Sequence, residues 1–433
     1  MKDKLLKGTA AALAGVGLLT GCTAAASIGA EAVYPKMAQY PGENGDYEAW
    51  NASRRKQLAA PEGYADGLWD FYADSTRTYL SGKKENCAYS PLNLYMALSM
   101  LAECCGGESR AQILELMNAP DIESLRTQAG QVWNANYCDD GALTSILADS
   151  VWLDDSVSFE KNVVDTLAKS YYASTYTGKF GSDNMNSAIQ SWLNKQTGGL
   201  LGDAVNNVAP DDTTLMALYS TAYFKGRWDS EFNPELNDTR KFHAPDGNID
   251  AEFMNQSYER DYFWGEDFGA VRQSFVSGCD MWLILPDEDK SIDDVLTSGE
   301  YVGLIRPGSS EYENERYIRV NLALPKFDVS STTDLKSGLE ALGVTDVFDP
   351  GNADFSELSS SDEMYVGTAR QSARVTIDEE GCTAAAFTEI LMCGSACPPE
   401  DIQEIDFVLD RPFIFVITGM DGQPLFTGTV YTV

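Results

Sequence analysis

Residues 375–399 are VTIDEEGCTAAAFTEILMCGSACPP. They begin like a β-strand at 375–377 and continue through an acidic pair, a glycine and small residues that follow neither the strand nor the helix period. A segment of about twenty residues without regular structure is uncommon in a compact domain, and it is usually functional or disordered. Apolar runs at 407–409 and 413–417 follow it, so both of its ends are predicted to be anchored in sheets.

The first part of this segment resembles a known motif. Residues 379–388, EEGCTAAAFT, resemble the hinge of the reactive-centre loop of inhibitory serpins, which are suicide inhibitors of serine and cysteine proteases. In that family the loop inserts into the main sheet as an extra strand. The hinge residues that the resemblance identifies are Glu379, Glu380, Gly381, Cys382, Thr383, Ala384, Ala385, Ala386 and Thr388.

The side chains of the hinge are compatible with insertion. If the hinge becomes a strand, alternate side chains face the core, and one such set is Cys382, Ala384, Ala386 and Thr388, all small. The bulkier Phe387 falls in the opposite, outward set. The alternative interpretation of this stretch alone is a mobile, alanine-rich surface loop.

The rest of the chain resembles the same family, in the same order. We therefore expect an α+β serpin fold, with N-terminal helices, three β-sheets and an exposed reactive-centre loop. The matching blocks are residues 86–117, 147–153, 189–200, 222–228, 281–286, 320–356 and 410–428.

Local signals predict the first helices of the domain. Leu68, Phe71, Tyr72, Ser75 and Tyr79 share one helical face. Ser90 can cap the next helix, with Pro91 in its first turn. Residues 92–101 are apolar almost all round, so this second helix is predicted to be buried.

The N-terminus indicates export. Residues 1–22 combine an early positive charge with a short apolar run, as in a signal peptide. Residues 19–22, LTGC, resemble a bacterial lipobox, which implies cleavage before Cys22, lipidation of Cys22 and a membrane-anchored surface lipoprotein. An uncleaved anchor or a chance cysteine is the alternative. Residues 23–60 lack sustained periodicity and are predicted to be a flexible tether, followed by the serpin domain at 61–433.

Composition limits the possible partners. A formal net charge of −35 disfavours nucleic acid and anionic lipid surfaces, because both repel an acidic protein. Hydrophobic residues at 44% are enough for a large core. The nine cysteines are scattered rather than spaced like a disulfide framework or a zinc site, so no metal and no cofactor are expected.

The sequence does not support an enzyme. Hydrolytic triads need a histidine base, and the one histidine, His243, lies in a turn-like context without a nucleophile motif nearby. Residues 118–138 carry a single cation, Arg126, so no basic face for a polyanionic cofactor is expected. The chain is interpreted as a monomeric inhibitor whose loop is a substrate.

Counting along the family's hinge pattern gives the reactive bond. It places the bond at Ser395-Ala396, to within one or two residues. No Lys or Arg occurs between Val375 and Asp410, so a trypsin-like pocket has no suitable bond there. Small and apolar residues suit elastase-like or subtilisin-like serine proteases instead. The loop residues that flank the bond are Leu391, Met392, Cys393, Gly394 and Cys397.

The resemblance also assigns a cluster under the sheet, where the sheet opens. It consists of Ser90, Asn93, Ser220 and Gln371. Serpins commonly carry Ser, Asn and His at the positions of the last three, and all three differ here while remaining polar. A rewired hydrogen-bond cluster is therefore expected.

Two alternatives remain open from the sequence. A disulfide between Cys393 and Cys397 would tether the ends of the loop after cleavage and prevent insertion, whereas free thiols would not. A non-inhibitory serpin-like surface binding lipoprotein is the alternative function, although its hinge would typically carry bulky or charged inward residues. An ordinary surface lipoprotein is a third class.

Overall fold

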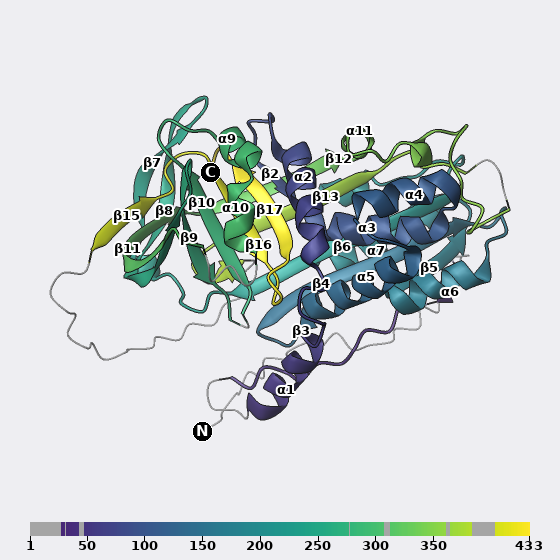
Figure 1. The fold of residues 1–433 in the computed structure, drawn as a ribbon, viewed down its shortest axis with the longest axis horizontal. Helices are drawn as coiled ribbons and strands as arrows, with labels where there is room; N and C mark the ends of the chain where they lie inside the picture. Colours follow the sequence, from purple (N-terminus) through teal and green to yellow (C-terminus); the bar gives the residue numbers. More distant parts are fainter. Residues whose placement is uncertain are drawn as a thin grey trace, which may run out of the picture.

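The structure is a computed structural model. It describes residues 27–30, 32–42, 47–276, 278–306, 312–360, 364–382 and 403–433. These residues form two large sheets with helices packed on the first of them (Figure 1). The α+β class expected from the sequence is confirmed.

The first sheet carries the candidate site. Its eight described strands run in the order β1-β5-β4-β6-β14-β13-β12, with β3 paired to β4. They are β1 (Ser27–Ala30), β3 (Cys138–Asp139), β4 (Leu143–Asp154), β5 (Ala173–Gly178), β6 (Met216–Arg227), β12 (Phe327–Asp334), β13 (Arg370–Ile377) and β14 (Gly381–Cys382).

The second sheet supports the other end of the molecule. Its nine described strands run in the order β15-β11-β8-β9-β10-β16-β17-β2, with β7 paired to β8. They are β2 (Cys87–Tyr89), β7 (Asp238–Ala244), β8 (Gly247–Trp264), β9 (Phe268–Ser274), β10 (Asp280–Pro286), β11 (Glu315–Pro325), β15 (Glu404–Val408), β16 (Phe413–Thr418) and β17 (Pro424–Val430).

The number of sheets differs from the expectation of three. The described strands form two hydrogen-bonded networks. The reason is β8, whose 18 residues pair with β7 and β11 along most of its length and with β9 at its last three residues. One long strand thus joins what would otherwise be two separate sheets.

The helices of the described chain lie mainly along the first sheet, as Figure 1 shows for α3 to α7. They are α1 (Tyr47–Gln57), α2 (Trp69–Leu80), α3 (Pro91–Cys104), α4 (Gly107–Leu116), α5 (Ile122–Asn136), α6 (Lys161–Ser170), α7 (Asp183–Gln196), α8 (Asp203–Asn206), α9 (Ile292–Ser298), α10 (Glu300–Ile305) and α11 (Lys336–Ala341), with short 3-10 turns at Asp66–Leu68, Pro234–Leu236 and Asp346–Phe348.

The prediction for α3 is confirmed. The Ser90 side chain accepts a hydrogen bond from the Asn93 amide, and Pro91 occupies the first turn. All residues of the helix except Ala97 are buried, because α3 lies between α2, α4 and α5 and the strands β6 and β17. Its N-terminus is thereby fixed under the first sheet.

Apolar side chains fill both faces of the first sheet. Along β4, Leu147 and Val151 belong to the main core beneath α3, whereas Ala148 and Trp152 belong to a smaller cluster beneath α7. This alternation is the period of a strand that is covered on both sides.

The predicted tether at 23–60 needs correction over its described part. β1 pairs with the edge strand β5, α1 follows, and Trp50 is buried with its indole N–H donating to Asp140 Oδ2 at 2.8 Å. Tyr34 stacks on Trp133. The aromatic residues of this segment have no helical or strand period, so the sequence pattern could not indicate that they pack against the domain.

Candidate functional site

The hinge begins inside the first sheet. Gly381 and Cys382 form β14, which lies between β6 and β13. Cys382 is opposite Gly226 on one side and Ile377 on the other, and its side chain is 2% exposed. The first small residue of the inward set thus faces the core.

A tight turn carries the chain from β13 into β14. The Asp378 side chain accepts hydrogen bonds from the amides of Glu380 and Gly381, at 3.0 and 3.1 Å. At Gly381 an added Cβ would lie 2.1 Å from the Gly226 carbonyl oxygen, so the strands pass too closely for any side chain there. Glycine is required at this position for steric reasons.

The loop after β6 holds this turn from the other side. The amide of Trp228 donates to the Glu380 carbonyl at 2.9 Å, and the amide of Phe232 donates to the Glu379 carbonyl at 3.0 Å. The Trp228 indole N–H donates to the Asp378 carbonyl at 2.9 Å, while its ring stacks on Phe275. The loop after β6 therefore binds three consecutive carbonyls, those of Asp378, Glu379 and Glu380.

The Glu379 carboxylate adds a charged contact. It accepts from Lys326 Nζ at 2.7 Å and from Asn237 Nδ2 at 2.5 Å. Burial raises the pKa of Glu379, but the hydrogen bonds from Lys326, from its own backbone amide and from Asn237, with the Lys326 charge, outweigh burial, and the pKa ends below its ordinary value. Glu379 is thus ionised and held at neutral pH.

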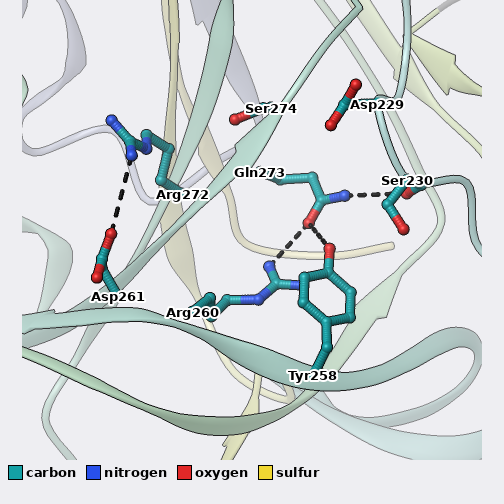
Figure 2. Close-up of a pocket in the computed structure, with 8 residues that line it drawn as sticks. All are labelled: Asp229, Ser230, Tyr258, Arg260, Asp261, Arg272, Gln273 and Ser274. Atoms are coloured by element: carbon teal, nitrogen blue, oxygen red, sulfur yellow. Dashed lines mark hydrogen bonds and ion pairs between the residues drawn. The ribbon is translucent and has the colours of Figure 1, made fainter. Parts of the chain in front are cut away.

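A polar pocket of about 190 Å³ lies behind the same loop (Figure 2). In it the buried Arg260 stacks over the Tyr258 ring and donates to Gln273 Oε1 at 2.8 Å, while Gln273 donates to the Ser230 carbonyl at 3.2 Å. Gln256 donates to the same carbonyl at 2.8 Å. This network fixes the loop that holds the hinge.

Beyond β14, the facing edges of β6 and β13 have no strand between them in the described chain. β6 pairs with β4 on its other edge, and β13 pairs with β12. Both strands are antiparallel to β14, so they run parallel to each other. The arrangement can accept a strand that continues β14.

The four residues of the cluster that the resemblance assigned are in contact. Ser90 and Gln371 exchange two hydrogen bonds: the Ser90 amide donates to Gln371 Oε1 at 2.7 Å, and Gln371 Nε2 donates to the Ser90 carbonyl at 2.9 Å. Gln371 also reaches Asn93 Oδ1 at 3.4 Å, and Asn93 Nδ2 donates to Ser220 Oγ at 2.8 Å. A hydrogen-bond chain therefore connects β13 to β6 through the N-terminus of α3.

The sequence analysis missed Asp149. This residue lies on β4 directly opposite Ser220, and it is 1% exposed. The signal was available in the alternation at 147–153, where an acid occupies an inward position between Leu147 and Val151. The sequence could not show, however, that this position is fully buried and that burial and Ser220 alone set its pKa.

Several predicted residues lie outside the described residues. They are the lipidation residue Cys22, the hinge residues Thr383, Ala384, Ala385, Ala386 and Thr388, the bond Ser395-Ala396, and the flanks Leu391, Met392, Cys393, Gly394 and Cys397. Their roles remain predictions.

Other kinds of site would depend on metal ligands, on the histidine, on the cysteines or on a membrane-spanning helix in the described chain. None of its acidic, histidine and cysteine side chains gather in threes as metal ligands would. His243 is about half exposed on β7 and contacts Asn248 at 2.9 Å. The six described cysteines are free thiols. No described helix is long and apolar enough to cross a bilayer.

Comparison with known proteins gives a consistent result. Residues 70–433 match the family model described as Serpin (serine protease inhibitor). Serpin-ZX of Arabidopsis thaliana is 28% identical over 367 residues, which are 80% of this chain and 92% of that protein. Plasminogen activator inhibitor 1 of Neovison vison is 26% identical over 371 residues, 81% of this chain and 88% of that protein.

A solved structure agrees with these relatives. The thermophilic serpin tengpin in its native state has a TM-score of 0.74 to this chain, at 24% identity, covering 86% of this chain and 95% of that one. This likeness concerns the fold, and the two relatives come from a plant and a mammal.

Proposed function

The chain belongs to the serpin family, and we propose that it inhibits elastase-like or subtilisin-like serine proteases as a suicide substrate. The observation that carries this proposal is β14, in which the hinge residues Gly381 and Cys382 are already paired between β6 and β13, two parallel strands that form no backbone pairs with each other in the described chain. After cleavage, the loop can extend β14 in the register that Gly381 and Cys382 already have with β6 and β13.

The register of the proposed insertion follows from the existing pairs. Continuing the Cys382–Gly226 and Cys382–Ile377 pairs by six residues places Thr388 opposite Ser220 and Gln371. The inward side chains would then be the small set predicted from the sequence. The inserted strand would then run past the hydrogen-bond cluster that joins α3 to both strands.

The energy of insertion is sufficient for a trap. About ten to fifteen new backbone hydrogen bonds at ~1 kcal/mol each amount to on the order of 10 kcal/mol. This is comparable to the stability of a whole domain. An acyl-enzyme formed at Ser395 would be carried along with the inserting hinge, and its active site would be distorted before hydrolysis.

The protease class follows from the loop sequence. No cation occurs between Val375 and Asp410, and Leu391 and Met392 precede small residues at the proposed bond. We also propose that the chain is exported and held at the cell surface of a bacterium through lipidated Cys22. The LTGC sequence at 19–22 supports this localisation.

The test is a mixture of the purified domain with an elastase-like protease. We expect a covalent adduct that survives boiling in detergent. We also expect a released C-terminal peptide whose mass, measured by mass spectrometry, corresponds to a chain that starts at Ala396. A protease whose catalytic serine is replaced by alanine should give no adduct, because no acyl bond can form.

A matched variant tests the bond itself. Ser395→Arg supplies the cation that a trypsin-like pocket needs, so this variant should form the adduct with trypsin while the unmodified chain does not. Cleavage of the unmodified loop by elastase-like and subtilisin-like proteases with no adduct would overturn the inhibitory proposal and favour a non-inhibitory binding role.

A further inference from the structure

The Asp149 carboxyl group is buried and has no ion-pair partner among the described residues. Neither of its oxygens has a hydrogen-bond partner among the described residues. Its cross-strand neighbours are Ser220 on β6 and Ala173 on β5. The Ser220 hydroxyl accepts a hydrogen bond from Asn93 Nδ2 at 2.8 Å. It also donates to the Asn93 backbone carbonyl, but this bond is long, at 3.5 Å. The hydroxyl can rotate about its C–O bond and donate to Asp149 instead.

An ionised carboxylate at this point is costly, because burial without donors disfavours the charged form. Burial raises the pKa of Asp149 to about 7, and the Ser220 hydroxyl lowers it only in part. No charged group contributes to the shift. The charged side chains on the elements around this point are Glu103 on α3, Glu123 and Arg126 on α5, Asp154 on β4, Lys225 and Arg227 on β6, and Arg370 and Arg374 on β13.

Parting of the strands would change this environment. Ser220 is on β6 and Gln371 is on β13, and Asn93 bonds to both. If β6 moves away from β13, this chain of hydrogen bonds must break. The Asn93 amide and entering water can then become donors to the neighbouring carboxylate in addition to the Ser220 hydroxyl, and donors favour its ionised form.

We propose that Asp149 is a proton switch on the opening of the first sheet, protonated while β6 and β13 are held together and ionised once they part. This inference rests on the proposed function, since it concerns the regulation of the same site. Asp149 acts as a positioning residue, because it is buried within the first sheet and acts through its neighbour Ser220.

The sign follows from proton linkage. The closed sheet binds the proton up to about pH 7, whereas in the open sheet the carboxyl would return toward the ordinary aspartate value. Opening therefore releases a proton. Falling pH favours the closed sheet, and opening becomes easier as pH rises toward 7 and levels off above it.

The experiment measures opening directly. An acetylated peptide with the sequence of residues 381–392, carrying the Cys382→Ser change to remove its thiol, is labelled and mixed with the whole exported chain between pH 5.5 and 8.5. Its one ionisable side chain, Glu389, stays charged throughout this range. We expect the rate of stable uptake to rise about thirtyfold across the range, since opening gains about tenfold per pH unit between pH 5.5 and about 7 and then levels off.

Two variants remove the switch. Asp149→Asn keeps the shape of the side chain but cannot ionise, and Asp149→Ser also lacks the charge; either should make uptake independent of pH. The matched control is His243→Gln, because histidine is the side chain that ordinarily titrates in this range and the chain has only one. This control should keep the full rise with pH.

The outcomes separate the two proposals. Uptake that rises with pH equally in the unmodified chain and in both Asp149 variants would overturn the switch while leaving insertion intact. Loss of the rise in His243→Gln would assign the proton to His243 and also overturn it. No uptake in any chain at any pH would remove the proposed insertion and the switch together.

Discussion

Gly381 shows how closely the hinge is fitted to the sheet. A Cβ added to Gly381 would lie 2.1 Å from the Gly226 carbonyl oxygen and 2.9 Å from the Arg227 Cα. Both are backbone atoms of β6, so they cannot turn away as a side chain would. The requirement comes from the close partner strand and also from the backbone of the turn, where Gly381 has a positive φ of 156°.

We therefore predict that Gly381→Ala displaces β14. The amide of Trp228, which donates to the Glu380 carbonyl, should exchange with solvent at least about tenfold faster, because its acceptor moves away. Hydrogen exchange followed by mass spectrometry measures this. The control is Gly367→Ala, where an added Cβ meets no atom within 4 Å. Equal exchange in the two variants would contradict the close packing of the hinge.

Glu379 and Asp149 illustrate opposite outcomes for a carboxyl group near one sheet. Glu379 is partly buried yet receives two donors, and its pKa falls. Asp149 is fully buried without firm donors, and its pKa rises to about 7. Depth and donor supply together decide which group is ionised at neutral pH.

At the scale of elements, the N-terminal segment behaves as part of the domain. α1 is held by Trp50, whose ring contacts Tyr40 and Tyr47 edge-on and lies under the Arg54 guanidinium at 4.7 Å. The indole N–H donates to Asp140, which lies between β3 and β4. One aromatic side chain thus attaches α1 to the first sheet.

We predict that Trp50→Ala releases α1 from the domain. Losing a buried aromatic side chain and its hydrogen bond should reduce the free energy of unfolding by about 3 kcal/mol, and proteases should cut within 47–57 faster. Denaturant titration and limited proteolysis measure these effects. Leu58→Ala is the control, since that side chain is 39% exposed and its loss should change little. Equal loss in both variants would argue against this attachment.

At the scale of the whole molecule, the proposed function implies that the intact chain is less stable than its cleaved form. The facing edges of β6 and β13 have no strand between them beyond β14 in the described chain. A strand inserted between these two edges would complete the backbone pairing of the first sheet. The intact fold would then persist because the uncut loop cannot reach that position.

We predict that cleavage of the loop raises the Tm by at least about 10 °C, because about ten backbone hydrogen bonds of ~1 kcal/mol are added. Scanning calorimetry of nicked and intact protein measures this. Thr388→Arg puts a long cation in the inward set and should abolish the gain, whereas Phe387→Arg, in the outward set, should retain it. A nicked chain that melts with the intact one would rule out insertion.

The sequence by itself determined the family, the α+β class and much of the local structure. The capped start of α3 at Ser90, its burial and the strand at 375–377 could be predicted because caps, proline positions and apolar periods act within a few residues of the chain. The residues of the cluster under the sheet were available only through the resemblance.

Only the tertiary structure decided the contacts between distant segments. It packed the supposed tether against β5 and α5, joined the strands of the second sheet through β8, set the register of β14 and placed Asp149 beside Ser220 without a counter-charge. The physical reason is that burial, desolvation and strand register depend on contacts between segments that are distant in the sequence. A local sequence pattern does not specify those contacts.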